Sequence, residues 1–236
     1  MSRKPWAIHS AGLTGKKKMK RAATITLAFA ITLGGCTYKV MPTSTKPMNI
    51  YSHHDEKVHG RFGLLIDHSV REVHRSIKPS SHACSGHSYP LEMGDSLATS
   101  VRHTSEMLFD EVVEMHTAPT GEAMRADNIR GYALVKLDEF KPRVNCAAGF
   151  WSMTCTAHAD VAFGITVRGL DGILFSTAVG GTKSADGDAG GACEAVAGLV
   201  ANAIELATRD ALERMAERIS NSPKLRANAT PTEEKK

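Results

Sequence analysis

The sequence has no apolar run long enough to cross a membrane as a helix. The apolar core of its first segment, from Ala22 to Leu33, holds about a dozen residues, whereas roughly 20 are needed to span the ~30 Å of hydrocarbon in a bilayer. A retained transmembrane helix is therefore not expected. A phosphate-binding loop is missing as well, because residues 180–184 (GGTKS) lack the spacing of the G-x-x-x-x-G-K-[ST] pattern.

Excess positive charge is missing from everything beyond residue 35. The 236-residue chain has a formal charge of +4, but residues 1–35 contain seven of its 29 Lys and Arg and none of its 25 Asp and Glu. The remainder carries 22 positive against 25 negative groups, a formal charge of −3. The basicity belongs to the first segment, so the electrostatic case for a nucleic-acid partner disappears.

Residues 1–35 have the three zones of a secretory signal peptide: a positive region at 16–21, an apolar core, and small residues before a cut. A more typical signal begins at Met19, which is an alternative start. The sequence Leu33-Gly34-Gly35-Cys36 resembles the lipobox of bacterial lipoproteins. That resemblance implies cleavage before Cys36, a diacylglycerol on its sulfur and a further acyl chain such as palmitate on the new amine. The alternative is a signal cut elsewhere, with Cys36 incidental.

Several acyl chains would make such an anchor permanent, because each buried methylene contributes ~0.8 kcal/mol and a single chain holds only marginally. Thr37 follows the lipid site. By the lipoprotein sorting pattern, the absence of aspartate there implies export to the outer membrane. We therefore expect a lipid-anchored protein of the outer membrane, with its domain facing the periplasm.

The rest of the chain divides into three parts by composition. Residues 36–57 are polar, contain two prolines and show no sustained period, so we expect a lipidated cysteine followed by a tether. Such a tether would have an average reach of about 25 Å. Residues 58–220 are long enough for a single α+β domain with one core. Residues 221–236 predict a disordered tail.

Four cysteines remain after Cys36, and an even number in an exported protein indicates two disulfides. Three pairings are open. We favour Cys146 with Cys155, because they bracket a short loop, and Cys84 with Cys193 by elimination. The second bond would tie an early segment of the domain to its final helix.

Hydrophobic periodicity predicts strands and helices in a defined order. Alternating apolar residues predict four strands: 62–66, 132–137, 157–167 and 173–179. Three- and four-residue spacing predicts helices from Asp95 to Met115 and from Ala192 to about Ile219. We expect the α+β class, with a mostly antiparallel sheet and two helices packed on one face, in the order β-α-β-β-β-α.

The last two predicted strands form a hairpin. For the odd-numbered apolar residues of both strands to share a face, paired residues must have an even sum. A three-residue loop, Leu170-Asp171-Gly172, satisfies this condition, with Gly172 at the left-handed position. The predicted pairs are Val167 with Phe175, Ile165 with Thr177, and Phe163 with Val179.

Catalytic motifs are incomplete. Residues 86–90 (GHSYP) approach the nucleophile-elbow pattern but have proline where the second glycine is needed. A serine hydrolase using Ser88 and an undetermined histidine is therefore only an alternative, and we expect neither an enzyme nor a cofactor. Asp186-Gly187-Asp188 resembles a calcium loop faintly, but its twelfth position is Ala197 instead of glutamate.

Histidines are concentrated before the first long helix, with seven of eleven between His53 and His87. Within that span, His82, Cys84 and His87 put two imidazoles and a sulfur in one short loop, which could form part of a zinc or copper site. No paired Cys or Glu motif completes four ligands. We expect no metal, and a periplasmic metal-binding lipoprotein is the alternative function.

Three features together carry a resemblance: the lipobox at residues 33–36, the hairpin Val161–Val179 with Asp171-Gly172, and the alanine-rich helix beginning near Cys193. Over about residues 60–220 this arrangement resembles small bacterial outer-membrane lipoproteins of the YajG-like kind. More loosely, it is similar to lipoproteins that assist secretion channels, flagellar rings or peptidoglycan synthases. The resemblance implies a non-catalytic structural or assembly component of an envelope complex. Its partners would be the outer membrane, a protein of that complex, and further copies in a dimer or ring.

Overall fold

A five-stranded mixed sheet forms the centre of the fold. The computed structural model describes residues 36–229. The strands of this sheet are β1 (Val58–Ile66), β4 (Phe109–Met115), β5 (Ile129–Ala148), β6 (Met153–Gly169) and β7 (Gly172–Asp188). Their order across the sheet is β4-β1-β5-β6-β7. β1 pairs in parallel with both β4 and β5, whereas β5, β6 and β7 are antiparallel neighbours.

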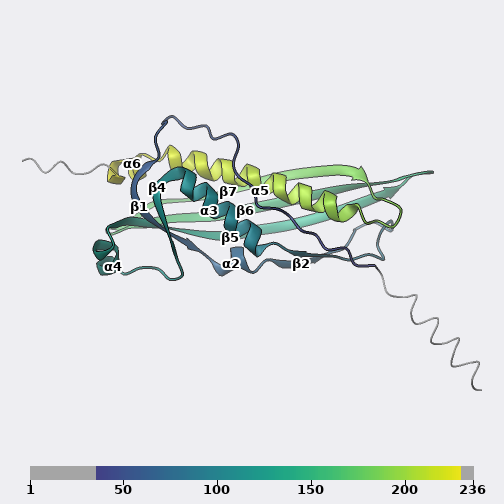
Figure 1. Ribbon diagram of the computed structural model, residues 1–236. Helices are drawn as coiled ribbons and strands as arrows, with labels where there is room; N and C mark the ends of the chain where they lie inside the picture. Colours follow the sequence, from purple (N-terminus) through teal and green to yellow (C-terminus); the bar gives the residue numbers. More distant parts are fainter. Residues whose placement is uncertain (1–35, 230–236) are drawn as a thin grey trace, which may run out of the picture. The chain divides into compact units, whose positions relative to one another are not determined.

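Helices cover one face of this sheet, and a small second sheet lies beside it (Figure 1). The helices are α2 (His68–Arg71), α3 (Gly94–Leu108), α4 (Gly121–Ala126), α5 (Val196–Ser220) and α6 (Pro223–Ala229). α5 packs on β6 and β7 with α3 beside it. The second sheet is the antiparallel pair β2 (His74–Ile77) and β3 (Tyr89–Glu92).

The core lies between β6 and α5, where two predicted periodicities meet. Alternate residues of β6 from Cys155 to Val167 are buried, as a strand with one wet face requires. The predicted stripe of α5 is buried too: Val196, Val200, Ala203, Ala207, Ala211 and Met215. Three of these six helix residues are alanine, so helix and sheet approach each other closely.

The predicted arrangement of the sheet is wrong: it is neither mostly antiparallel nor covered by only two helices. β1 lies in the middle of a parallel trio, because a long crossover containing α2, the β2–β3 pair and α3 returns the chain to β4 in the same direction. The connection through α4 then places β5 on the other side of β1, again parallel. Alternation in residues 62–66 identified a strand but carried no information on the direction of its neighbours.

The predicted helix from Asp95 to Met115 ends early. α3 stops at Leu108, and Phe109 is its C-cap in an extended conformation. Residues 109–115 form β4, so Val112 and Met115 lie on a strand although their spacing continued the helical stripe. The helical spacing of Val112 and Met115 is a coincidence, because an interval of three puts them on opposite faces of β4.

The predicted pairs of the β6–β7 hairpin are confirmed. Phe163 lies opposite Val179, Ile165 opposite Thr177, and Val167 opposite Phe175. Beyond Val167 a β-bulge shifts the register by one residue, and Gly172, at φ +125°, pairs with Gly169. The loop is therefore two residues long, Leu170 and Asp171, and the predicted three-residue loop is wrong. The bulge supplies the extra residue that keeps the odd-numbered apolar residues of both strands on one face.

Residues 37–57 are not a free tether, as the sequence suggested; they form a strap along α5 and α3. We call residues 37–57 the strap. Val40 is fully buried and bridges to β3. Further on, backbone N–H groups of the strap donate to the carboxylates of Glu205 and Glu213 on α5, at 2.7–3.1 Å. Asn221 completes the series by bonding the backbone of the strap twice.

The C-terminal end also differs from the expected disordered tail. Residues 223–229 form α6, and Leu225 is fully buried. The predicted signal peptide, residues 1–35, lies outside the described residues. Within residues 36–229, no helix is both long and apolar enough to span a membrane.

Gly181→Ala should destabilise the fold by about 1–3 kcal/mol through overpacking. A β-carbon on Gly181 would lie 2.1 Å from the carbonyl oxygen of Ala207 and 2.8 Å from the backbone nitrogen of Ala211, so α5 would have to move. Gly180→Ala is the matched control, because its β-carbon would meet nothing closer than 3.5 Å. Urea unfolding of both variants measures the difference; equal stabilities would contradict the close packing described above.

Candidate functional site

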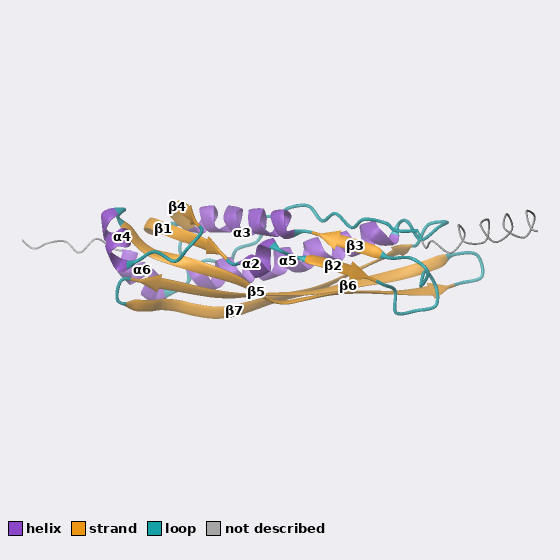
Figure 2. Ribbon diagram, turned by 90° about the horizontal axis from the view of Figure 1, so that it is seen from below, coloured by secondary structure: helices purple, strands orange, loops and turns teal. Residues whose placement is uncertain are grey.

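The described chain begins at one end of the long strands (Figure 2). Cys36 is exposed, and its carbonyl oxygen accepts a hydrogen bond from Ser88 N at 3.4 Å. Tyr38 N donates to Ser88 O at 3.1 Å, and the Tyr38 ring lies 5.6 Å from the ring of His87. We call this region the cystine end. It comprises Cys36 and the segments 78–88, 146–155 and 189–195.

Two disulfides hold the cystine end together, and both are the pairs that the sequence favoured. Cys84 is bonded to Cys193 with an S–S distance of 2.04 Å, and Cys146 to Cys155 with 2.00 Å. Cys146 and Cys155 are also directly opposite each other in the β5–β6 ladder. The first bond joins the loop before β3 to the start of α5, so it crosses between segments that the backbone hydrogen bonds leave separate.

The two disulfides lie against each other. The Sγ atoms of Cys84, Cys146 and Cys155 are all within 4.8 Å of one another. Met153 Sδ lies 3.1 Å from Cys84 Sγ and 3.8 Å from Cys193 Sγ. These sulfurs form a buried apolar cluster that joins the loop before β3, the β5–β6 hairpin and the loop before α5.

Hydrogen bonds reinforce the sulfur cluster. Ser81 Oγ accepts from Cys146 N at 2.8 Å, and Ser80 N donates to Val144 O at 3.0 Å. The hydroxyl of Tyr89 donates to Cys193 O at 2.8 Å, and burial raises the pKa of Tyr89 to about 12. The three segments therefore form one rigid unit around the disulfides.

The alternative metal ligands lose their sulfur in this arrangement. Cys84 is oxidised and offers no thiolate, and thiolates are the form in which cysteine binds zinc. His82 is exposed on the loop, whereas His87 packs against Tyr38. The three predicted residues share a loop but do not form a ligand set.

Ser88 does not have the surroundings of a nucleophile. Its Oγ lies 2.7 Å from Ser76 Oγ, so two hydroxyls pair with each other across β2 and the start of β3. Among the described residues, no histidine nitrogen forms a hydrogen bond with Ser88. The pairing therefore provides no base to take the proton that a serine nucleophile must lose.

The turn between β5 and β6 carries the most exposed aromatic pair of the described chain. Phe150 is 88% exposed and Trp151 is 91% exposed, and their rings meet edge to face at 4.8 Å. Gly149 N donates to Ser152 O at 2.7 Å, which closes the turn. We call residues 149–152 the aromatic tip. The sequence signal that could have indicated it is the absence of any Asp, Glu, Lys or Arg between Arg143 and Asp160.

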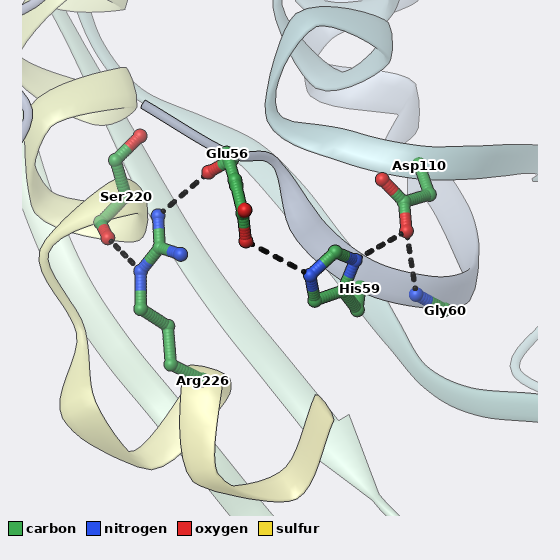
Figure 3. A network of polar contacts seen from close by, with 6 residues as sticks. All are labelled: Glu56, His59, Gly60, Asp110, Ser220 and Arg226. Carbon is green, nitrogen blue, oxygen red and sulfur yellow. Dashed lines mark hydrogen bonds and ion pairs between the residues drawn. The ribbon is translucent and has the colours of Figure 1, made fainter. Parts of the chain in front are cut away.

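A network of polar contacts lies at the start of β1, at the end of the strands away from Cys36 (Figure 3). His59 Nδ1 is 2.9 Å from Asp110 Oδ2, and His59 Nε2 is 3.2 Å from Glu56 Oε2. Arg226 of α6 donates to the backbone oxygens of Glu56 and Ser220, at 3.0 and 2.7 Å. These contacts fasten the last residues of the strap to β4 and α6.

Both ring nitrogens of His59 have a carboxylate partner. The hydrogen bond to Asp110 raises the pKa of His59 above its ordinary value, with Glu56 adding to the effect. In turn the hydrogen bond from His59 lowers the pKa of Asp110. Both ring nitrogens face carboxylates, so neither is available to take a proton from a serine or a water.

A shallow groove of about 460 Å³ runs between β2 and β5 beside the cystine end. Its apolar floor includes Phe140 and Val144, and four cations border it: Arg75, Lys78, Lys141 and Arg143. Lys141 pairs with Glu139 at 2.6 Å and Arg143 with Asp160 at 2.8 Å. Acidic neighbours thus offset half of the positive charge around this groove.

Comparisons with known proteins identify no family. No family model matches the chain, and no curated protein matches it. A protein of the DUF330 family from Xanthomonas campestris is 12% identical, with a TM-score of 0.44 over 79% of this chain and 93% of that one. A hypothetical protein from Chlamydia trachomatis is 7% identical, with a TM-score of 0.38 over 68% of this chain and 98% of that one. The PelC dodecamer from Paraburkholderia phytofirmans is 14% identical, with a TM-score of 0.29 over 68% of this chain and 94% of that one. Similarities this weak establish neither fold nor function.

His59→Gln should reduce stability more at a pH of about 5.5 than at about 8.5. Because the pKa of His59 is raised in the folded chain, protonated His59 stabilises the fold below its ordinary pKa of 6.5, and this contribution is lost as the pH rises through the raised value. Asp110, with its lowered pKa, contributes above its ordinary 3.8 and loses that contribution as the pH falls. Both contributions to stability are therefore present in full between pH 3.8 and pH 6.5, the ordinary pKa values of the two residues.

The measurement is urea unfolding of the wild type, His59→Gln, Asp110→Asn and the double variant at both pH values. Since the two residues act as one pair, the losses at the lower pH should be less than additive. Fully additive losses, or an equal loss at both pH values, would contradict the pairing.

Removing the two disulfides should have unequal effects. The bond between Cys84 and Cys193 closes a separation of 109 residues, and that between Cys146 and Cys155 one of nine. The chain-entropy relation gives about 5 kcal/mol for the first and about 3 kcal/mol for the second. Paired Cys→Ala variants and denaturant unfolding measure the difference. A larger loss for the short loop would show that packing of the sulfur cluster outweighs the entropy of the unfolded chain.

Proposed function

We propose that this protein is a non-catalytic lipoprotein of the outer membrane, anchored through acyl chains on Cys36, with its domain in the periplasm as a structural or accessory component of an envelope complex. One observation carries the proposal. The unit of the chain that contains the described domain begins at Cys36, the residue at which the lipobox pattern locates the cut, and this cysteine is exposed. All four other cysteines form disulfides, which suits the oxidising periplasm.

The packing of the strap supports a body that lies directly at the membrane. Tyr38 stacks on Tyr89 with ring centres 6.1 Å apart, and Val40 is fully buried, within four residues of the anchor. The tether of about 25 Å that composition suggested is therefore absent from residues 37–57. Acyl chains on Cys36 would hold the cystine end against the lipid.

The pairing of the reactive groups supports binding in place of catalysis. The ring of His59 is held by two carboxylates, the hydroxyl of Ser88 by Ser76, and the cysteines of the domain by each other. A metal-binding function is not favoured, because the sulfur it requires at Cys84 is oxidised.

The sheet offers surfaces for a protein partner. β4 and β7 are its two edges. Unpaired strand edges are templates for pairing with another chain. The face turned away from α5 is polar, with Thr156 bonded to Asp186 at 2.5 Å and Thr182 to Asp160 at 2.9 Å. A protein of the envelope complex, or further copies of this chain, would bind there.

Cys36→Ser should abolish lipidation and release the protein from the membrane. We expect the wild type, isolated from its native membrane, to have the intact mass of a triacylated chain starting at Cys36. Because the lipobox cut requires its cysteine, the variant is exported behind a signal peptide that is cut without lipidation. It should lack acyl mass and should appear in the periplasmic fraction, because no helix within residues 36–229 is both long and apolar enough to span a membrane. A wild-type protein without acyl mass would overturn the proposal. Cys84→Ser is unsuitable as a control because it breaks a disulfide, so Thr37→Ser, which preserves the pattern, serves instead.

A further inference from the structure

The aromatic tip and the anchor residue lie at the same end of the domain. In both ribbon views the turn between β5 and β6 extends at the end where Cys36 begins the described chain (Figures 1 and 2). Neither Phe150 nor Trp151 packs on the body. We infer that the aromatic tip inserts into the interfacial layer of the membrane that holds Cys36, as a second contact that fixes the orientation of the domain. The inference rests on the proposed lipid anchor.

A series of contacts connects the tip to the anchor residue. Cys36 is hydrogen-bonded to Ser88, four residues beyond Cys84. Cys84 Sγ lies within 4.8 Å of the sulfurs of Cys146 and Cys155. Two further residue pairs of the β5–β6 ladder, ending at Ala148 and Met153, lead from that disulfide to the tip. The sulfur cluster thus fixes the tip relative to Ser88, and the backbone hydrogen bonds of Ser88 with Cys36 and Tyr38 place the anchor residue beside it.

The composition of the tip suits the boundary between lipid and water. Tryptophan and phenylalanine bury large apolar surfaces, and the indole N–H of tryptophan retains a polar partner at headgroup level, which is why aromatic residues gather in membrane interfaces. No Asp, Glu, Lys or Arg occurs between Arg143 and Asp160. The hairpin can therefore enter the interface without desolvating a charge, which would be costly.

The charge around the tip selects the kind of lipid. Asp188 ends β7 and Glu194 lies on the loop that follows it. Each accepts a backbone hydrogen bond, from Gly190 N and Ala192 N respectively, at 2.8 Å. Backbone hydrogen bonds, its own first, hold the pKa of Glu194 below the usual range, so it stays charged. Lys78 is the one Lys or Arg of the cystine end, and these two carboxylates offset it, so no excess of positive charge at the tip attracts anionic headgroups. The occupant is therefore the interface of a zwitterionic phospholipid, not an anionic surface.

Tryptophan fluorescence tests the inference directly, because Trp151 is the only tryptophan beyond residue 35. The lipidated protein, produced from the full chain, is reconstituted into phosphatidylcholine and phosphatidylethanolamine vesicles. We expect emission at shorter wavelength than for the Cys36→Ser protein freed of residues 1–35, and hence of Trp6, and measured without vesicles. We also expect quenching by lipids brominated near the headgroup and protection from aqueous iodide. Trp151→Phe should remove these signals.

Two variants make the result specific. Phe150→Ser should weaken the quenching by brominated lipid, because it removes half of the inserted surface. Ile173→Ser is the matched control: Ile173 is 55% exposed on β7, beside the β6–β7 turn at the other end of the long strands, and its loss should leave the quenching unchanged. Iodide-accessible Trp151 in vesicle-bound wild-type protein would overturn the inference, as would quenching that requires anionic lipid.

The failure of the anchor and the failure of the tip give different results. Lipidated protein that floats with vesicles but leaves Trp151 in water would uphold the anchor and refute insertion. If the intact mass shows no acyl chain, the anchor fails, and vesicles added to the unlipidated protein then decide the tip. A blue shift in that case supports insertion, and an unchanged spectrum refutes it. A Trp151 signal that moves only on adding a copurified protein, and never with lipid, would also refute insertion.

Discussion

The close approach of α5 to β7 at Gly181 is the constraint on which the rest of the structure depends. A carbonyl oxygen of the helix occupies the space where a side chain at residue 181 would begin. Alanines at 203, 207 and 211 line the contact, each fully buried. Dispersion contacts are strongest at such short separations, so the small residues contribute packing instead of apolar bulk. The position of α5 over the sheet then determines where Cys193 meets Cys84 and where the glutamates of α5 face the strap.

The strap shows how an extended segment without a sheet partner can still be ordered. Its backbone N–H groups need acceptors, and Glu205 and Glu213 provide them from one helix face. Eight residues span about 12 Å of helix, which gives the extended chain two fixed points along α5. The same helix that packs on the sheet through alanine thus orders the strap through carboxylates. This is why the first residue of the compact unit lies at the cystine end and the last residues of the strap meet His59 at the other.

Residue patterns predicted those strands and helices that bury one face and expose the other. The β6–β7 register followed from the burial of Phe163 and Val179 on one side, and the stripe of α5 from its four-residue spacing. The disulfide pairing followed from few alternatives. Direction and termination could not be predicted this way, because β1 shows the same alternation beside parallel or antiparallel neighbours, and Val112 suits a helix or a strand equally. The strap could not be predicted because its backbone N–H groups find their acceptors on α5, which is distant in the sequence. The aromatic tip could not be predicted because exposed residues, unlike buried ones, produce no hydrophobic periodicity.

The two ends of the long strands differ in the chemistry that fixes them, and this difference bears on orientation. At one end the sulfur cluster and the contact between Tyr38 and Tyr89 are apolar. At the other end His59 lies between the carboxylates of Glu56 and Asp110, and Arg226 donates to the backbone oxygen of Glu56. Apolar contacts are compatible with a lipid boundary, whereas ion pairs at exposed positions require water.

With the proposed anchor at Cys36, the long strands would run away from the membrane and present the charged end to the aqueous phase. The edges β4 and β7 would then stand beside the membrane at different distances from it, because β4 pairs only with β1, whereas β7 follows β6 to the cystine end. A partner that binds along β7 would touch the domain from the membrane outward, and one that binds β4 would touch only its far half.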